Sequence, residues 1–269
     1  MAIRILHVGL GPIGVGVVRM CAARKGLRIV GAVDLDPAKI GKDVGEVAGL
    51  DRRIGVKVDG KLSAAVRAGK PDVVVLCTSS SLAKVADQIA DVAACGLPIV
   101  STTEELAYPW FSNTRLAKKI DAIARKAKVA VLGTGVNPGF TMDALPITLT
   151  GVCERVDAIR VERIQDASIR RLPFQQKIGA GLTPEQFAEK VKGGSVRHVG
   201  LTESVAMIAD AMGWKLETIT DVIGPKIATK TTSSQFLTVK KGQVAGIVQT
   251  GTGYDKDGQA RITLHMEAY

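Results

Sequence analysis

The chain has 269 residues, 46% of them hydrophobic and 23% charged, a composition typical of a globular protein with one or two domains. No apolar run reaches the roughly 18 residues of a membrane span, and the chain begins with a strand pattern instead of a secretory leader. The net charge of +10 is spread along the whole sequence, and only 4% of residues are aromatic. This composition excludes the basic, aromatic groove of a nucleic-acid-binding protein.

The four cysteines are scattered, with no C-x-x-C pair: Cys21, Cys77, Cys95 and Cys153. Their apolar surroundings predict reduced core residues in a cytoplasmic protein. The spacing predicts no metal site.

A glycine-rich stretch follows the first predicted strand. Residues 3–8 (Ile-Arg-Ile-Leu-His-Val) read as a buried strand, and Gly9, Gly11 and Gly14 follow in the spacing G-x-G-x-x-G. An apolar-periodic helix follows, and this strand–turn–helix context predicts a dinucleotide-binding turn. Gly9 permits the sharp turn, Gly11 lets the backbone approach a pyrophosphate, and Gly14 lets helix and strand pack closely.

The residues around this turn fit the same cofactor. Pro12 and Ile13 open the predicted helix, whose free N–H groups attract a phosphate. Asp34 ends the second strand, 20 residues after Gly14, where an acid accepts a hydrogen bond from the ribose 2′-OH. We therefore expect NAD or NADP, with NAD used at least as well, although Lys39 and Lys42 lie close enough in sequence to soften that preference.

The first half of the chain alternates strands and helices, which predicts a Rossmann-type, doubly wound parallel sheet. The expected elements after residue 34 are strands at 72–77, 97–100 and 128–132 and helices at 82–95 and 114–126. Such sheets bind ligands at the carboxyl ends of their strands. The polar side chains that follow these strands are therefore the candidate site.

Hydroxyl groups and two acids stand at these strand ends. The hydroxyl groups of Thr78, Ser79 and Ser80 are expected to contact the cofactor near its nicotinamide or to cap the following helix, and both roles can be filled by different residues. Thr102, after the next strand, is a further candidate for binding the cofactor. Glu104 and Glu105 follow Thr102. An acid at a helix start is usually there to interact with the helix dipole, so the pair leaves one carboxylate for each role.

The pattern changes near residue 140. Long alternating runs at 155–165, 216–227, 235–239, 244–250 and 260–267 predict a mainly antiparallel sheet, with helices at 141–149, from 183 and at 199–212. Asp255 to Gly258 is a hairpin-turn signal. We expect a cofactor domain at residues 1–139 and an α+β substrate-binding and dimerisation domain at residues 140–269.

Five motifs resemble 2,4-diaminopentanoate dehydrogenase and the related native amine dehydrogenases, in the wider dihydrodipicolinate reductase-like superfamily. They are Gly-Leu-Gly-Pro-Ile-Gly at 9–14, Ser-Thr-Thr-Glu-Glu-Leu at 101–106, Gly-Thr-Gly-Val-Asn-Pro-Gly-Phe at 133–140, Lys-Ile-Gly-Ala-Gly-Leu at 177–182 and His-Val-Gly-Leu-Thr-Glu-Ser at 198–204. The His-His-x-x-Lys pattern of the reductase itself is absent. Members of the family continue for several tens of residues beyond the last strand, so we expect their C-terminal tail to be absent here.

The resemblance implies NAD(P)-dependent, reversible oxidative deamination of a primary amine. It assigns the carboxylate that handles the iminium and its protons to Glu104, with Glu105 as the alternative. Asn137, which also borders the cofactor, would form the pocket floor with Pro138 and Phe140. The second-domain wall would comprise Arg170, Phe174 and His198.

We expect a homodimer through the second domain, because a half-exposed sheet needs cover and two-fold dimers are common. The expected ligands are a small amine or ketone and ammonia. Two alternatives stay open. One is an oxidoreductase of the homoserine or aspartate dehydrogenase type, and the other is a non-catalytic NAD(P)-binding protein.

Overall fold

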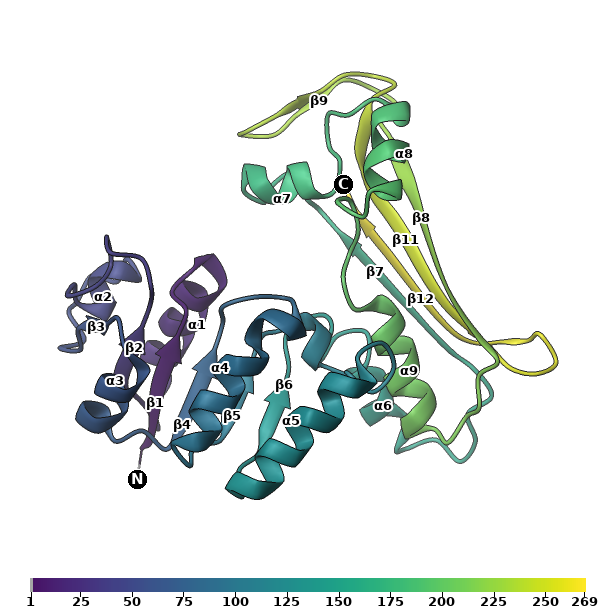
Figure 1. Cartoon of the computed structure of the whole chain (residues 1–269). Helices are drawn as coiled ribbons and strands as arrows, with labels where there is room; N and C mark the ends of the chain where they lie inside the picture. Colours follow the sequence, from purple (N-terminus) through teal and green to yellow (C-terminus); the bar gives the residue numbers. More distant parts are fainter. Residues whose placement is uncertain (1) are drawn as a thin grey trace. The chain divides into compact units, whose positions relative to one another are not determined.

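The computed structural model describes residues 2–269 (Figure 1). The chain forms two compact units, residues 1–135 and residues 136–269. The division lies a few residues before the boundary expected at residue 139. Each unit has its own sheet and its own core, and each is described by itself below.

The first unit contains a six-stranded sheet in the order β3-β2-β1-β4-β5-β6, and all neighbouring strands are parallel. The predicted Rossmann-type fold is confirmed. The bounds are β1 Ile3–Val8, β2 Leu27–Val33, β3 Val58–Asp59, β4 Val73–Leu76, β5 Ile99–Ser101 and β6 Val131–Gly133.

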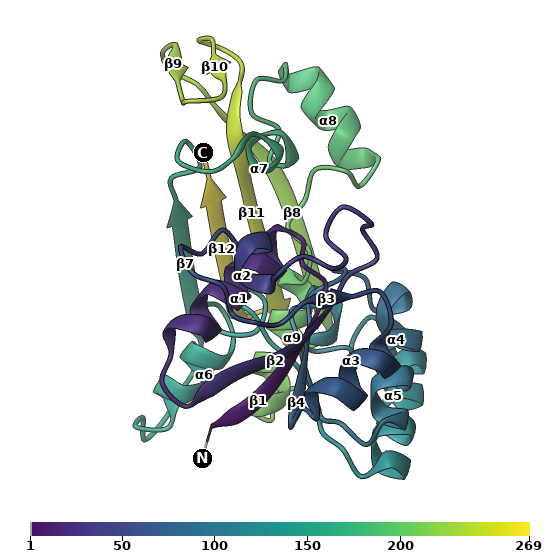
Figure 2. The same ribbon diagram turned by 90° about the vertical axis from the view of Figure 1, so that its left-hand side faces the viewer.

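Helices cover both faces of this sheet (Figure 2). Successive residues of one strand point to opposite faces, so Ile5 joins one buried cluster with α1 and α2, and Leu6 joins another with α3, α4 and α5. The helices are α1 Pro12–Ala23, α2 Val44–Val47, α3 Leu62–Gly69, α4 Leu82–Ala94 and α5 Thr114–Ala127, with a short 3₁₀ helix, η1, at Glu104–Leu106.

The second unit contains a four-stranded sheet in the order β7-β12-β11-β8. The strands are β7 Ile159–Gln165, β8 Thr218–Ile227, β11 Val244–Tyr254 and β12 Ala260–Ala268, and a separate pair is formed by β9 Thr232–Ser233 and β10 Thr238–Val239. The hairpin turn predicted at Asp255 to Gly258 joins β11 to β12. The sheet is mainly antiparallel, as predicted, but β7 pairs parallel to β12, because a long helical connection returns the chain to the sheet in the same direction.

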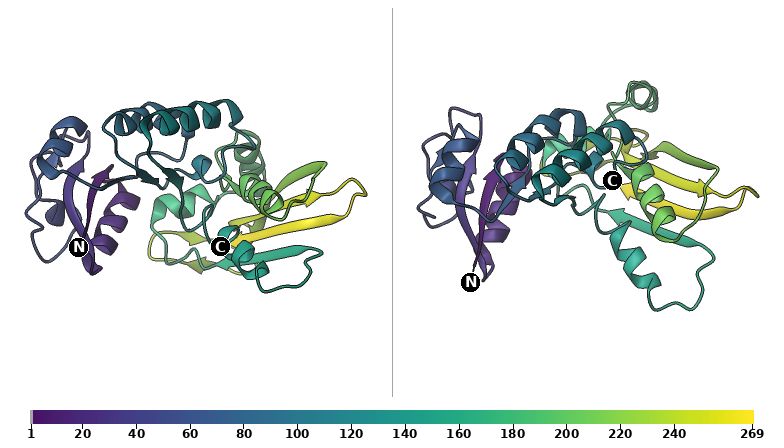
Figure 3. Two further views of the ribbon diagram at one scale, coloured as in Figure 1. Left: turned by 90° about the horizontal axis from the view of Figure 1, so that it is seen from below. Right: turned by 60° about the horizontal axis from the view of Figure 1, so that its bottom comes forward.

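The helices of the second unit are α6 Ala144–Thr150, α7 Leu172–Lys177, α8 Pro184–Lys192 and α9 Leu201–Ala211. Helix α9 lies against one face of the sheet (Figure 3), where Val205 and Ile208 join a buried cluster with Ile247 and Leu264. Side chains of the opposite face, such as His265 and Glu267, are only partly covered. Helix α8 begins as predicted, with a Thr183 capping box.

The cysteine expectation is half correct. Cys21 is buried and Cys77 half-buried, but Cys95 and Cys153 are exposed, because they lie just past the ends of α4 and α6, beyond the faces that these helices turn toward the cores. All four thiols are free. No helix within residues 2–269 is long and apolar enough to cross a membrane.

Candidate functional site

The glycine turn of the first unit has the geometry that its spacing predicts. Gly9 adopts φ +90°, and a Cβ atom there would stand 2.7 Å from the carbonyl oxygen of Cys77. A Cβ on Gly14 would collide with the carbonyl oxygen of Gly9. Both positions therefore require glycine, one for its backbone conformation and the other for the close approach of α1 to the turn.

Gly11 differs from its neighbours because the space beside it is open. A Cβ there would meet no atom within 4 Å, and Gly11 ends the turn as the N-cap of α1 without any side-chain cap. Pro12 and Ile13 in the first turn of α1 are exposed, Ile13 by 57%. An uncapped helix N-terminus that faces open space provides N–H donors for an anion. The residues of this turn thus fit a dinucleotide pyrophosphate.

Asp34 stands beside this turn at the end of β2. Its Oδ2 accepts from Leu10 N–H at 2.7 Å and lies 3.3 Å from Lys39 Nζ, and its Oδ1 accepts from Asp36 N–H at 2.9 Å. Desolvation opposes the charged form, yet the backbone hydrogen bonds and Lys39 together lower the pKa of this carboxyl. Asp34 is thus an ionised acceptor, and the nearby ammonium of Lys39 partly compensates its charge.

A ladder of hydroxyl groups joins the ends of β4 and β5. The single proton of Ser101 Oγ is shared between Leu76 O at 3.1 Å and Thr103 Oγ1 at 2.9 Å, and Thr103 Oγ1 donates to Ser79 O at 2.9 Å. Ser101 and Thr103 are buried. The ladder fixes the point at which the chain leaves β5, and hence the start of the short helix η1 with its two acids.

The other predicted hydroxyl residues lie around this ladder. Thr78 and Ser80 are exposed, and Thr78 Oγ1 donates to Gln88 Oε1 at 2.7 Å. Thr102 lies on the half-buried side of the β5 end, close to the Cys77 thiol. The N-cap of α4, Ser81, makes no side-chain cap, so the capping alternative for the hydroxyls that follow β4 is wrong, and an acid has that role instead.

The two acids have different surroundings. Glu105 Oε2 accepts from Leu82 N–H, the first residue of α4, at 2.8 Å, and Glu105 N–H donates to Ser80 O at 3.2 Å. This carboxylate therefore caps α4 and interacts with its dipole. Glu104 is half-buried at the start of η1. The geometry gives the helix-start role to Glu105.

In the second unit, the segment 137–143 is held by the start of α9. Asp143 is fully buried, and its Oδ2 accepts from Gly139 N–H and from Ser204 Oγ, both at 2.8 Å. Pro138, whose peptide bond with Asn137 is cis, packs against Gly200, where a Cβ would stand 2.5 Å from the proline ring. Two motifs that are far apart in the sequence, 133–140 and 198–204, thus form one assembly.

Asn137 and His198 meet in this assembly. Asn137 Nδ2 lies 3.0 Å from His198 Nε2 and 3.2 Å from Met142 Sδ. Asn137 Oδ1 is buried and has no hydrogen-bond partner within residues 2–269. Burial, together with the charges of Arg163 and Lys177, lowers the pKa of His198 to about 4. The ring is therefore neutral at pH 7, and its Nε2 accepts from the amide.

Two cationic side chains lie close enough to His198 for their charges to lower its pKa: Arg163 on β7 and Lys177 at the end of α7. Arg170 is in turn close enough to Arg163 for the two like charges to interact. Burial and the charge of Arg170 lower the pKa of Arg163. Arg170 also stacks on Phe174, with its guanidinium carbon 4.8 Å from the ring centroid. The predicted residues Arg170, Phe174 and His198 thus belong to one positively charged region.

Phe140 is 52% exposed and lies outside the buried cluster of the second unit. The sequence reasoning missed four residues that support the predicted ones: Arg163, Asp143, Ser204 and Gln249. Ser204 falls within a quoted motif and Asp143 lies three residues after another, so both had a weak signal. Arg163 and Gln249 had none, because each stands in an ordinary alternating strand.

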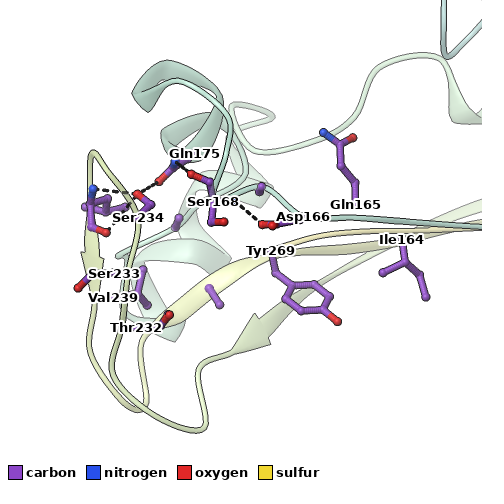
Figure 4. A pocket seen from close by; sticks show the side chains of 14 residues that line it. Ile164, Gln165, Asp166, Ser168, Gln175, Thr232, Ser233, Ser234, Val239 and Tyr269 are labelled. Atoms are coloured by element: carbon purple, nitrogen blue, oxygen red, sulfur yellow. Dashed lines mark hydrogen bonds between the residues drawn. The ribbon is translucent and has the colours of Figure 1, made fainter.

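A pocket of about 400 Å³ lies elsewhere in the second unit, near the end of β7 and Tyr269 (Figure 4). Its walls include Gln175, whose Nε2 donates to Ser168 O at 3.1 Å and whose Oε1 accepts from Ser234 Oγ at 2.9 Å. None of the predicted substrate residues lines it. The hydrogen bond from Ser234 ties α7 to the β9–β10 hairpin. Across residues 2–269, no three His, Cys, Asp or Glu side chains are grouped to hold a metal.

Comparisons with known proteins agree with this division of the chain. The family described as 2,4-diaminopentanoate dehydrogenase C-terminal domain matches residues 140–267, and that described as dihydrodipicolinate reductase, N-terminus, matches residues 3–132. The solved amine dehydrogenase of Mycobacterium smegmatis has a TM-score of 0.82 at 25% identity, covering 100% of this chain and 79% of that one.

Two curated relatives extend over both units. An amine dehydrogenase of Streptomyces virginiae is 23% identical over 261 residues, or 95% of this chain and 72% of that protein. The 2,4-diaminopentanoate dehydrogenase of Acetoanaerobium sticklandii is 36% identical over 267 residues, or 97% of this chain and 74% of that protein. The resemblance of the motifs is therefore confirmed along nearly the whole chain, which belongs to the 2,4-diaminopentanoate dehydrogenase family.

Proposed function

We propose that the chain is an NAD(P)-dependent amine dehydrogenase. It oxidises a primary amine to an imine, which water converts to a ketone or aldehyde and ammonia, and it also catalyses the reverse reductive amination. The observation that carries this function is the 36% identity with a 2,4-diaminopentanoate dehydrogenase across 97% of the chain. The glycine turn with its open helix N-terminus supports the cofactor class independently.

The cofactor would be held at the carboxyl edge of the first sheet. Gly9, Gly11 and Gly14 form the pyrophosphate turn with Pro12 and Ile13, and Asp34 receives the adenosine ribose. The hydroxyl residues at the strand ends would border the nicotinamide half: Thr78, Ser79, Ser80 and Thr102. When bound, NAD(P) supplies or accepts the hydride of the reaction.

Glu104 would handle charge and protons at the substrate nitrogen. A carboxylate stabilises a cationic iminium by charge and transfers protons to and from nitrogen. Glu105 is the less suitable acid, because its carboxylate already caps α4. This division of roles supports Glu104 as the catalytic carboxylate.

Asn137, Pro138 and Phe140 would form the floor of the substrate pocket, and His198 its wall. The free acceptor on Asn137 Oδ1 suits an N–H donor of the substrate or cofactor. The neutral His198 ring offers hydrogen bonding without adding a further positive charge. Both properties suit a ligand that is itself an amine.

The cationic region favours a substrate that also carries a carboxylate. A simple amine is a cation and would be repelled by Arg163, Arg170 and Lys177, whereas an amino acid with a second amine brings a compensating negative charge. The acid named in the A. sticklandii relative is of this class. Arg163→Gln should therefore raise KM for a carboxylate-bearing diamine and lower KM for a simple amine, because it removes one of the repelling charges.

We also propose a homodimer through the open face of the second sheet. This face bears both charges, with Arg160 and Glu162 on β7 and Lys226 paired to Glu267 at 2.8 Å, so it can complement a two-fold copy of itself. Val222 on the same face is 65% exposed. Light scattering at micromolar concentration tests this, and a monomer mass would contradict it.

The free thiols support a cytoplasmic location.

A panel assay tests the function. The purified chain is given NADH or NADPH with ketones and keto acids, with and without ammonia, and NAD or NADP with 2,4-diaminopentanoate, simple amines, homoserine and aspartate. Turnover that requires ammonia is the expected result. Turnover only with homoserine or aspartate would assign a related dehydrogenase, and cofactor binding without any turnover would assign a sensor.

A further inference from the structure

Gln249, at the centre of β11, is fully buried, and both ends of its amide are engaged. Its Oε1 accepts from His198 N–H at 2.8 Å, and its Nε2 donates to His198 O at 3.1 Å. One side chain thus pairs with both backbone groups of a residue that is 51 positions away. The loop before α9 is held to the sheet at the residue whose ring meets Asn137.

Asp221 on the neighbouring strand β8 fixes the orientation of this amide. Both of its carboxylate oxygens accept from Gln249 Nε2, at 2.9 Å and 3.0 Å. A carboxylate is only an acceptor, so it selects the amide orientation with nitrogen toward Asp221 and oxygen toward His198 N–H. The amide cannot reverse without placing two acceptors against each other.

This clamp determines where the His198 ring stands. With its N–H and C=O both held, the residue has a fixed Cα–Cβ direction, and the ring lies 3.0 Å from Asn137 Nδ2. Asn137 is fixed independently, because the segment that follows it is held by Asp143 and Ser204. The sheet therefore positions His198 through Gln249, and α9 positions Asn137 through Ser204 and Asp143.

We propose that Gln249 and Asp221 are positioning residues of the amine dehydrogenase reaction: they set His198 against Asn137 and thereby the fit of the amine substrate. The inference rests on the proposed function, because it takes His198 and Asn137 as substrate contacts. Neither Gln249 nor Asp221 touches reacting atoms. Their effect passes through the position of the His198 ring.

Gln249→Glu is the decisive variant, because it keeps the size of the side chain. The new carboxylate faces that of Asp221 and loses the donor to His198 O. We expect kcat/KM for the amine to fall at least tenfold, mainly through KM, since a displacement of about 1 Å in a site can cost about 10²-fold. The Kd for NADH should stay unchanged, because the cofactor turn belongs to the first unit.

The second variant tests rescue. The double variant combines Gln249→Glu with Asp221→Asn. Its new amide donates to one oxygen of the new carboxylate, and the other oxygen accepts from His198 N–H. Part of the lost kcat/KM should therefore return. Thr252→Val is the matched control. It removes a buried hydroxyl from the same strand with no bond to His198, and it should lower the melting temperature at most.

A spectroscopic measurement separates the positioning role from the proposed function. The chain has only three histidines, so the ring ¹⁵N signals of His198 can be assigned with a His198→Gln variant. Gln249→Glu should shift these signals, and Thr252→Val should not. Unchanged signals, or shifted signals with an unchanged KM, would overturn the positioning role. Shifted signals in a chain without ammonia-dependent turnover would overturn the proposed function while retaining the clamp.

Discussion

The two units build their candidate sites in opposite ways. In the first unit the site lies at the ends of successive parallel strands, and its central requirement is backbone geometry: Gly9 and Gly14 stand where a Cβ cannot fit. In the second unit the site joins Asn137, His198 and Gln249, which are distant in sequence and linked by side-chain hydrogen bonds. A site shaped by backbone geometry restricts the residue type at only a few positions. A site built from a network of side-chain hydrogen bonds depends on every side chain in that network.

Glu104 and Glu105 should differ sharply in what their loss costs the protein. Glu104→Gln should reduce turnover by about 10²–10⁴-fold with cofactor affinity retained, because loss of an acid–base group typically costs that much. Glu105→Ala should instead cost about 1 kcal/mol of stability through the lost α4 cap, with turnover near that of the parent chain. Steady-state kinetics and urea unfolding measure both.

The opposite pattern would reverse the assignment. If Glu105→Ala lost turnover and Glu104→Gln kept it, the capping carboxylate would also be the catalytic one. The chemistry of the first unit would then also depend on a side-chain contact, the one between Glu105 and Leu82 N–H at the start of α4.

The difference between the units explains how much could be predicted from the sequence. The parallel sheet, the glycine turn and Asp34 follow from local signals, since glycine spacing and strand–helix alternation are written in neighbouring residues. The parallel pairing of β7 was not predictable, because alternation shows which residues face the core but not the direction of the neighbouring strand. Gln249 and Arg163 were not predictable either, because His198, which both of them influence, comes from a distant segment.

Gly11 and Gly14 differ in whether the space beside them can hold a side chain. Gly11→Ala should leave the melting temperature unchanged, because Gly11 has φ −67° and open space around it, but should raise the Kd for NADH by about tenfold or more, about 1.4 kcal/mol, by filling the space for the pyrophosphate. Gly14→Ala should cost about 1–3 kcal/mol of stability as well, because its Cβ collides with Gly9. Equal melting temperatures for the two variants would contradict this reading.

His7 provides a stability test that concerns the first unit alone. The ring is fully buried in β1, neither ring nitrogen has a partner within residues 2–269, and burial lowers its pKa to about 4 from 6.5. Below pH 6.5 the unfolded chain binds a proton that the folded chain does not, so stability falls as the pH drops toward 4. From pH 7 to pH 5 this loss is about 2 kcal/mol.

His7→Leu removes the titration and the unpartnered polar atoms at similar volume. Its free energy of unfolding should therefore change less between pH 7 and pH 5 than that of the parent chain. Urea unfolding at the two pH values measures the difference. An identical pH dependence in the variant would show that the His7 ring is solvated or paired in the folded chain and that burial does not lower its pKa.

Phe140 tests the second unit at its exposed edge. Removing a ring from a packed core costs about 3–5 kcal/mol, but a ring that is 52% exposed should cost much less. Phe140→Ala should therefore leave the melting temperature nearly unchanged, accept longer or branched ketones and weaken activity on the smallest. A large fall in melting temperature with an unchanged size profile would place the ring in the core instead of the pocket.

Lys39 bears on cofactor choice in the first unit through its pairing with Asp34. Lys39 Nζ lies 3.3 Å from both Asp34 and Asp36, with its side chain 27% exposed, so each contact is a partly screened pair worth about 0.2–1 kcal/mol. Lys39 softens the repulsion between Asp34 and a 2′-phosphate, and it can itself attract that phosphate. Lys39→Ala should therefore raise KM for NADPH by about fivefold at most, the equivalent of 1 kcal/mol, and leave KM for NADH unchanged.

Lys42→Ala is the control, since no ion pair joins Lys42 to Asp34 among residues 2–269. An equal change for both cofactors would mean that Lys39 acts on the fold of the loop and not on the charge beside the ribose.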